Sequence, residues 1–434
     1  MTAERAAGSR EPMSPADAAW LQMDRPTNRM IISALLTFDG PLDPGALQRT
    51  LLRVAALPRF HQRVFLPGIL PGRPEWRDDP AFDLGAHVRH LAAPAPGGNA
   101  GLRQLVSDRM SARLPLSKAL WEVDVIDGGG GASALLLRVH HCIGDGIALV
   151  SAMLGLADEP AAAPPEPQGR REKSFGPLAW AGQQLIRAGT FGRMLALPAD
   201  PPTPFRGPTG PAKRAAWSAP VPLPHLRALA REHHATVNDV LMGTLAGVLR
   251  EWLIHAGREV PDRDIRALVP VFLGGRNAAM GNRFGMAFVD LPLAEPDAGA
   301  RIRALKKSMD AIKASPMAPV AFDVLRFFGI AGRAVEKIGV DIFTRKATVM
   351  VTNVPGPRSR IRLAGRELES VMVWAPTSGG LGLSVTLLTY GGELRMGVAA
   401  DARLDADPQA LIRGLERALT PPRPSASPQP QPAA

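Results

Sequence analysis

The sequence of 434 residues contains one cysteine, Cys142, and no long run of apolar residues. A single cysteine excludes an intrachain disulfide. The absence of disulfides is typical of proteins that work in a reducing compartment. A membrane-spanning helix needs about 20 consecutive, mostly apolar residues, and no stretch approaches that length. Residues 1–11 are polar and charged and lack the apolar core of a signal peptide. We therefore expect a cytoplasmic protein without a transmembrane segment.

Aromatic residues are also few, at 5% of the chain, whereas basic residues are in excess. The formal net charge is +11, from 51 Lys and Arg against 40 Asp and Glu. Such a balance favours anionic partners, including nucleic acids, anionic lipids and phosphate-bearing substrates. No nucleic-acid-binding module is recognisable from aromatic or zinc-finger spacing, so we expect no nucleic-acid partner. A solvated, Arg-rich surface explains the same charge without any partner.

The most informative stretch lies where an apolar run ends at two histidines, His140 and His141. Residues 133–139 predict a buried strand, and residues 121–126 predict a second strand that joins it through an Asp-Gly turn as a hairpin. Consecutive side chains of a strand point to opposite faces, so the two rings are not expected to share a metal ion. No third ligand stands at a zinc-like spacing, and we expect no metal.

A helix is predicted directly after the histidines, over residues 147–156. Asp145 is placed to cap its first turn, and Gly146 to form a tight turn. Cys142 has two interpretations, as a nucleophile beside His141 or as a buried structural thiol. Neighbours in an extended chain point apart, which separates a cysteine from an adjacent histidine, so we favour the buried thiol.

Apolar periodicity and capping residues predict several other elements. Ser14, Asp43, Thr236 and Asp407 each stand where a helix is expected to begin. Strands are expected over residues 31–38, 265–272, 284–291, 348–352, 371–374, 383–389 and 394–399.

The residues also carry a family resemblance. The pattern His-His-x-x-x-Asp-Gly at residues 140–146 resembles the active-site motif of the CoA-dependent acyltransferase superfamily, which includes chloramphenicol acetyltransferase-like enzymes and peptide-synthetase condensation domains. Six further blocks resemble, in the same order, the bacterial wax ester synthase/diacylglycerol acyltransferase family. They are MSPADA at 13–18, LPR at 57–59, LWE at 120–122, VNDV at 237–240, GNR at 281–283 and TNVPGP at 352–357. The resemblance extends from about residue 13 to residue 419.

This resemblance implies a chemistry. His141 is the expected general base, which deprotonates a diacylglycerol or a long-chain alcohol for direct attack on the thioester of acyl-CoA. Acyl-CoA is a substrate, so no cofactor is implied, and no acyl-enzyme is needed. His140 and Asp145 are expected to support the site structurally, with Asp145 paired to an arginine such as Arg138, and Gly146 to form the turn. The motif matches place four further residues along the substrate channel: Asn238, Asp239, Asn282 and Asn353.

The capping box that begins at Thr236 accounts for Asn238 and Asp239 without any function. Two other functions also remain open for the whole chain. One is a condensation-type acyltransferase that uses a carrier-bound acyl donor, and the other is an inactive lipid-binding relative.

The resemblance implies an α/β fold, with two chloramphenicol acetyltransferase-like sandwich lobes and a channel between them. We expect a disordered lead at residues 1–12, an N-terminal lobe at 13–157, a crossover linker at 158–214, a C-terminal lobe at 215–419 and a disordered tail at 420–434. The sequence assigns no oligomeric state.

The linker contains an apolar segment, residues 175–197, that is a candidate for membrane contact. Basic residues flank or interrupt it: Arg170, Arg171, Lys173 and Arg187. A basic, apolar helix of this kind can lie on a membrane surface, although packing on the protein body is the alternative. We expect peripheral association with the inner face of the membrane or with lipid droplets.

Overall fold

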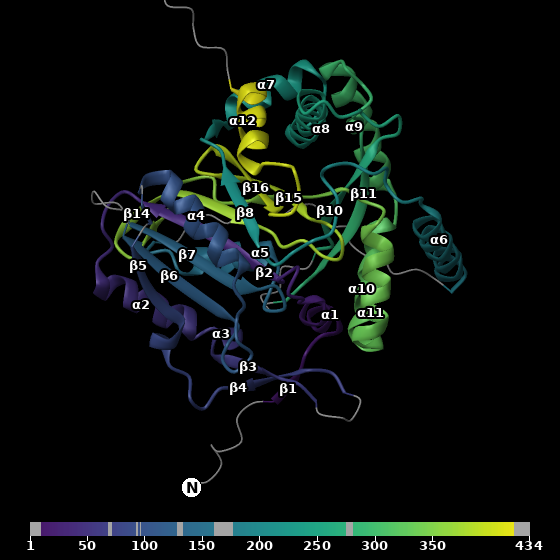
Figure 1. The fold of residues 1–434 in the computed structure, drawn as a ribbon. Coiled ribbons are helices and arrows are strands. Elements are labelled where there is room, and N and C mark those ends of the chain that lie inside the picture. The colour runs from purple at the N-terminus through teal and green to yellow at the C-terminus, as the bar shows by residue number, and fades with distance from the viewer. Residues whose placement is uncertain are drawn as a thin grey trace, which may run out of the picture.

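The chain forms two mixed β-sheets flanked by helices, with a small third sheet at one end (Figure 1). The computed structural model describes residues 10–67, 72–92, 94–95, 97–127, 133–159, 177–274 and 281–420. Each large sheet contributes to a separate hydrophobic core, so the predicted two-lobed α/β fold is confirmed.

The first sheet has six strands in the order β13-β14-β2-β7-β6-β5. Their bounds are Arg362–Leu363, Arg366–Trp374, Ile31–Phe38, Ser133–His140, Trp121–Asp127 and Val88–Ala92. Strands β6 and β7 pair antiparallel, with Trp121 opposite Val139, as the predicted hairpin requires. The turn between them, residues 128–132, lies outside the described residues.

The second sheet has the order β11-β10-β12-β15-β16-β8, and β9 also pairs with β16. Their bounds are Phe284–Leu291, Ile265–Phe272, Val349–Pro355, Leu383–Tyr390, Glu393–Asp401, Lys213–Trp217 and Val221–Pro222. The small sheet contains β1 (Arg10–Pro12), β4 (Glu75–Asp78) and β3 (Gln62–Phe65).

The helices begin largely where capping residues predict. Ser14, Asp43, Thr236 and Asp407 each accept a backbone N–H bond in the first turn of α1, α2, α8 and α12. The helices are α1 Pro15–Met23, α2 Pro44–Ala55, α3 Pro58–His61, α4 Gly98–Ser111, α5 Gly146–Gly155, α6 Pro177–Ala196, α7 Leu223–Glu232, α8 Val237–His255, α9 Ala298–Ala314, α10 Met317–Ala331, α11 Arg333–Thr344 and α12 Pro408–Leu419. A short 3₁₀ helix spans Leu84–His87.

Helices α3, α10 and α11 are among the elements that the sequence does not predict. Among the described residues no single helix is long and apolar enough to cross a membrane. The helices α9 and α10 satisfy that criterion only as a pair, across a bend of 62°.

The two halves of the chain exchange elements. Strand β14 of the second half pairs antiparallel with β2 in the first sheet, with Val371 opposite Leu36. Conversely, α1 of the first half packs on α10, where a Cβ added to Gly329 would lie 1.7 Å from the carbonyl oxygen of Pro15. The predicted C-terminal lobe, residues 215–419, therefore does not form one lobe by itself, because β13 and β14 complete the first sheet.

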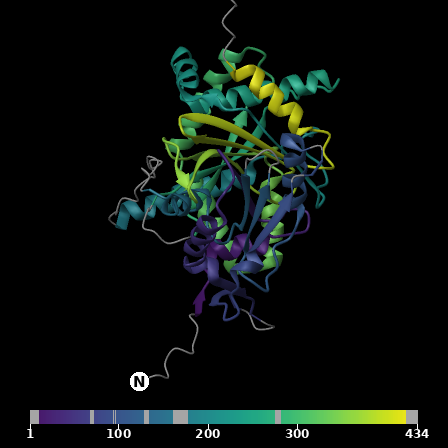
Figure 2. The ribbon, with the colours of Figure 1, turned by 90° about the vertical axis from the view of Figure 1, so that its left-hand side faces the viewer.

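The end of the expected crossover linker, residues 158–214, is built into the second lobe. Asp200 accepts hydrogen bonds from the backbone N–H of Arg266 and from Thr348 Oγ1, both at 2.7 Å, and forms an ion pair with the Arg266 guanidinium at 3.1 Å. Helix α6 precedes it and lies at the periphery of the molecule in both views (Figures 1 and 2). Residues 160–176 lie outside the described part of the chain.

A buried charge cluster supports the first sheet. Glu122 and Arg138 stand directly opposite each other on β6 and β7, are 1% and 0% exposed, and form an ion pair at 3.0 Å. Arg109 and Arg89 also contact the Glu122 carboxylate, at 2.8 and 2.6 Å. Burial lowers the pKa of Arg138 to about 10, which leaves it charged at neutral pH. The predicted pairing of Arg138 with Asp145 is therefore wrong, since the cross-strand neighbour is Glu122.

Removing this carboxylate should destabilise the fold. We expect Glu122→Ala to lower the free energy of unfolding by about 3–5 kcal/mol, because Arg138 would remain buried without its counter-ion. The surface pair of Arg360 and Glu367 provides a control, and Glu367→Ala should cost less than about 1 kcal/mol. Urea unfolding of both variants measures the difference, and equal losses would contradict this account.

Candidate active site

The imidazole of His141 lies at the end of β7, enclosed by aromatic rings. Its backbone N–H donates to the carbonyl oxygen of Met30 at 2.7 Å, which fixes the chain directly after the strand. The ring stacks on Trp20 with centroids 4.1 Å apart and planes 10° apart, and the Phe284 ring lies 5.7 Å away. Only 7% of the residue is exposed. The position of the imidazole is therefore restricted on both sides.

Asn282 fixes the orientation of this ring. Its Nδ2 donates to the carbonyl oxygen of His141 and to Asp17 Oδ1, both at 2.8 Å, so its Oδ1 is the atom that faces His141 Nδ1, also at 2.8 Å. An amide oxygen can only accept, so Nδ1 must carry the proton. In the neutral imidazole, Nε2 then has a free lone pair. Nε2 makes no hydrogen bond with any residue that the structure describes.

Asp17 completes the chain of hydrogen bonds and was not among the predicted site residues. Its Oδ2 accepts a hydrogen bond from Ser14 Oγ at 2.7 Å, and its Oδ1 binds Asn282. Burial raises the pKa of Asp17, while the bonds from Asn282 and Ser14 oppose that rise. In the sequence, helix capping by Ser14 and Asp17 accounts for both residues, and nothing local connects them with residue 282.

The electrostatic surroundings favour a neutral His141. Burial lowers its pKa below the usual value, whereas the nearby charge of Asp145 and the bond to Asn282 act in the opposite direction. A lowered pKa keeps the imidazole unprotonated at neutral pH, as a general base requires. The role itself stays a prediction.

His140 lies in different surroundings from His141. Its Nδ1 accepts the backbone N–H of Cys142 at 3.2 Å, and its Nε2 has no hydrogen-bond partner among the described residues. Burial, together with the charges of His141 and Arg29, lowers the pKa of His140 to about 3. The ring thus accepts a hydrogen bond in the turn after β7 and remains neutral, and its structural role stays a prediction.

Cys142 is fully buried, as its interpretation as a structural thiol requires. Burial and the charges of Asp17 and Asp24 raise the pKa of its thiol well above the usual value. A protonated thiol is a poor nucleophile, so the structural interpretation holds. Among the described residues, no three His, Cys, Asp or Glu side chains are grouped to hold a metal ion.

Asp145 links the helix after the histidines to the segment that carries Asn282. Its Oδ1 accepts the backbone N–H groups of Ile147 and Ala148 at 3.1 and 3.0 Å, which confirms its predicted capping of α5. Its Oδ2 accepts the backbone N–H of Arg283 at 3.1 Å, and its own N–H donates to the carbonyl oxygen of Gly281 at 3.2 Å. The partner of Asp145 is thus the main chain on both sides of Asn282.

The other predicted channel residues lie apart from this chain of hydrogen bonds. Asn353 Nδ2 donates to Asn238 Oδ1 at 3.4 Å. Val354, the next residue on β12, would lie 3.6 Å from a Cβ added to Gly146, so the pair stands near the start of α5. Asp239 is fully buried and accepts from Thr236 in the capping box. Of the four candidates, only Asn282 contacts His141.

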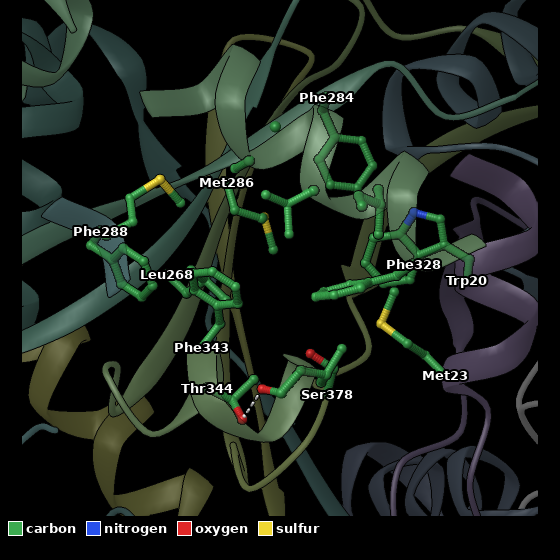
Figure 3. Close-up of a pocket in the computed structure, with 16 residues that line it drawn as sticks. Trp20, Met23, Leu268, Phe284, Met286, Phe288, Phe328, Phe343, Thr344 and Ser378 are labelled. Atoms are coloured by element: carbon green, nitrogen blue, oxygen red, sulfur yellow. Dashed lines mark hydrogen bonds between the residues drawn. The ribbon is translucent and has the colours of Figure 1, made fainter. Parts of the chain in front are cut away.

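An apolar pocket adjoins the aromatic rings that enclose His141 (Figure 3). It contains about 640 Å³ of empty space, its open mouth included. Trp20 and Phe284 form one end of its wall. Side chains of β10, β11, α10 and α11 form most of the rest, together with Met23 of α1 and Met194 of α6. Thr344 and Ser378 are the polar residues in an otherwise hydrophobic lining. The shape and chemistry suit a hydrocarbon chain that ends near His141.

Comparison with known proteins identifies the family of the chain. Residues 13–241 match the wax ester synthase/diacylglycerol acyltransferase catalytic domain, and residues 280–421 match the WS/DGAT C-terminal domain. The probable diacylglycerol O-acyltransferase tgs1 of Mycobacterium tuberculosis is 29% identical over 94% of both chains, and tgs2 of the same organism is 27% identical over 94% of this chain and 97% of its own length.

Solved structures share the fold. The wax ester synthase/diacylglycerol acyltransferase from Marinobacter aquaeolei VT8 has a TM-score of 0.70 and 24% identity, and covers 94% of this chain and 98% of its own. The first condensation domain of the CDA synthetase has a TM-score of 0.60 and 19% identity, and covers 95% of this chain and 94% of its own. The protein is an O-acyltransferase by class. The chain belongs to the wax ester synthase/diacylglycerol acyltransferase family.

Asn282 provides a test of the site. We expect Asn282→Ala to lower kcat by about 10- to 100-fold with little change in KM, because the His141 ring would lose the acceptor that selects its tautomer. Thr348→Val is the matched control, since it removes a buried hydrogen bond to Asp200 in the second lobe. Steady-state kinetics and thermal unfolding of both variants separate positioning from stability. Wild-type kcat in Asn282→Ala would contradict the role.

Proposed function

We propose that the protein transfers a fatty acyl group from acyl-CoA to the hydroxyl of a diacylglycerol or a long-chain alcohol, with His141 as the general base. The observation that carries the proposal is the hydrogen bond from His141 Nδ1 to Asn282 Oδ1. It leaves Nε2 free to accept a proton. The family membership of the chain supports the class of reaction.

The steps follow from this geometry. Nε2 takes the proton of the acceptor hydroxyl while the oxygen attacks the thioester carbonyl carbon. The carbon–sulfur bond then breaks, and the CoA thiolate recovers the proton from the imidazolium. Stacking on Trp20 stabilises the transient cation, because an aromatic face attracts positive charge. No protein nucleophile takes part, which agrees with the protonated thiol of Cys142.

The pocket beside His141 supports a lipid acceptor or acyl chain. Its lining is almost wholly apolar, from Met23 and Phe328 near α1 to Phe288 on β11. Burying an alkyl chain there would release about 0.8 kcal/mol for each CH₂ group that leaves water. Both the donor chain and the proposed acceptors are long-chain lipids. We therefore also propose that the protein works in the cytoplasm on the inner face of the membrane or on lipid droplets.

An assay with labelled acyl-CoA tests the reaction. Purified protein should release free CoA and form triacylglycerol from diacylglycerol, a wax ester from a long-chain alcohol, or both. His141→Ala should reduce turnover at least about 10²–10⁴-fold. The control His255→Ala alters an exposed histidine whose Nδ1 contacts only its own helix, at Glu251, and should retain turnover. Use of free acyl-CoA also excludes dependence on a carrier-bound donor.

Two results would overturn the proposal. One is the absence of thioester consumption by the wild-type protein with either acceptor. The other is wild-type turnover in a folded His141→Ala variant.

A further inference from the structure

Exposed apolar side chains gather on three helices, α6, α10 and α11. Thirteen large hydrophobic side chains are exposed among the described residues, and nine of them lie on these helices. The most exposed include Leu185 at 76%, Ile330 at 64%, Ile338 at 63% and Ile186 at 60%. Large exposed patches of this kind mark interaction sites on protein surfaces.

Helix α11 carries apolar side chains on two opposite faces. Val335, Ile338 and Ile342 are exposed at spacings of three and four residues and so share the outer face. Val340 and Phe343 point the other way and line the pocket. A helix on a water-exposed surface is normally polar on its outer face. Large apolar side chains therefore occupy part of the water-exposed surface of α11.

The three helices are neighbours in the structure. Arg187 on α6 bonds Asp323 on α10. Helix α10 packs on α11, where the Phe328 ring occupies the space beside Gly339. In Figure 1 the three lie together at one edge of the molecule. We call this surface, made of the exposed residues of α6, α10 and α11, the outer apolar face.

The charge of the outer apolar face is positive. Each acidic side chain on α10 and α11 is bonded to an arginine: Asp323 to Arg187, and Glu336 and Asp341 to Arg25. In contrast, Arg193, Arg326 and Lys337 are exposed and form no ion pair with any described residue. Two copies of such a face would repel each other, whereas an anionic lipid surface would attract it.

We propose that the outer apolar face docks on an anionic phospholipid bilayer. Its exposed side chains would insert among the lipids, and its free basic residues would contact the head groups. The inner sides of α10 and α11 line the pocket that reaches Trp20 and Phe284 beside His141. Docking thus places the pocket at the membrane surface. Docking names the surface that would make the membrane contact included in the proposed function. Delivery of a lipid acceptor rests on the proposed reaction, whereas docking itself does not.

Vesicle flotation of the full chain tests the proposal. We expect wild-type protein to float with vesicles of phosphatidylcholine and phosphatidylglycerol at low salt, and less with phosphatidylcholine alone or at high salt. Ile330→Ser combined with Ile338→Ser should lower the bound fraction at least about tenfold, and Arg326→Gln with Lys337→Gln should remove the preference for anionic lipid. The control, Leu52→Ser with Ile254→Ser, changes two comparably exposed residues on α2 and α8 and should bind as wild type.

Three outcomes would overturn docking: wild-type protein that does not float, equal flotation of the Ile330/Ile338 variant, or a wild-type dimer that this variant dissociates. The last would identify a second copy as the occupant of the face. Turnover of a short-chain, water-soluble alcohol without vesicles is measured in parallel. Turnover without flotation contradicts docking alone, and flotation without turnover contradicts the proposed reaction alone.

Discussion

The hydrogen bond between His141 and Asn282 connects the two halves of the molecule at the point where chemistry is expected. His141 directly follows the central hairpin of the first sheet, and Asn282 lies two residues before the start of β11 in the second. Asp17 holds Asn282 from α1, and Asp145 holds the main chain on both sides of it. Because each of these groups is buried, a loss of one partner would leave the others without satisfied hydrogen bonds. The site therefore exists only when both lobes are in place.

The exchange of elements explains how the two lobes keep a fixed position relative to each other. Strand β14 joins the first sheet beside β2, while α1 lies against α10, close enough that only a glycine fits at position 329. Rigid connections on two sides of the site hold Trp20, which stacks on His141, and Phe284 at fixed distances from the ring. The same two aromatic residues form the end of the apolar pocket. Positioning of the proposed base and of a hydrocarbon chain in the pocket would thus depend on one set of contacts.

Local features of the fold could be predicted from the sequence, because strands and helix starts depend on nearby residues. The buried run before His140, the cap at Asp145 and the box at Thr236 all appear as predicted. The partner of Arg138 was predicted wrongly, although the register of the hairpin places Glu122 directly opposite. The role of Asp17 and the exchange of β14 depend on contacts between residues more than 200 positions apart, which no local pattern reveals.

The protonation of His141 is the most direct test of the central claim. Nitrogen-15 spectra of histidine-labelled protein, assigned with His141→Ala, report which ring nitrogen carries the proton and at which pH the ring becomes charged. We predict a neutral ring protonated at Nδ1 and bare at Nε2, with a pKa below the usual 6.5, since burial disfavours the cation. A proton on Nε2 at neutral pH, or a pKa above 6.5, would contradict the account.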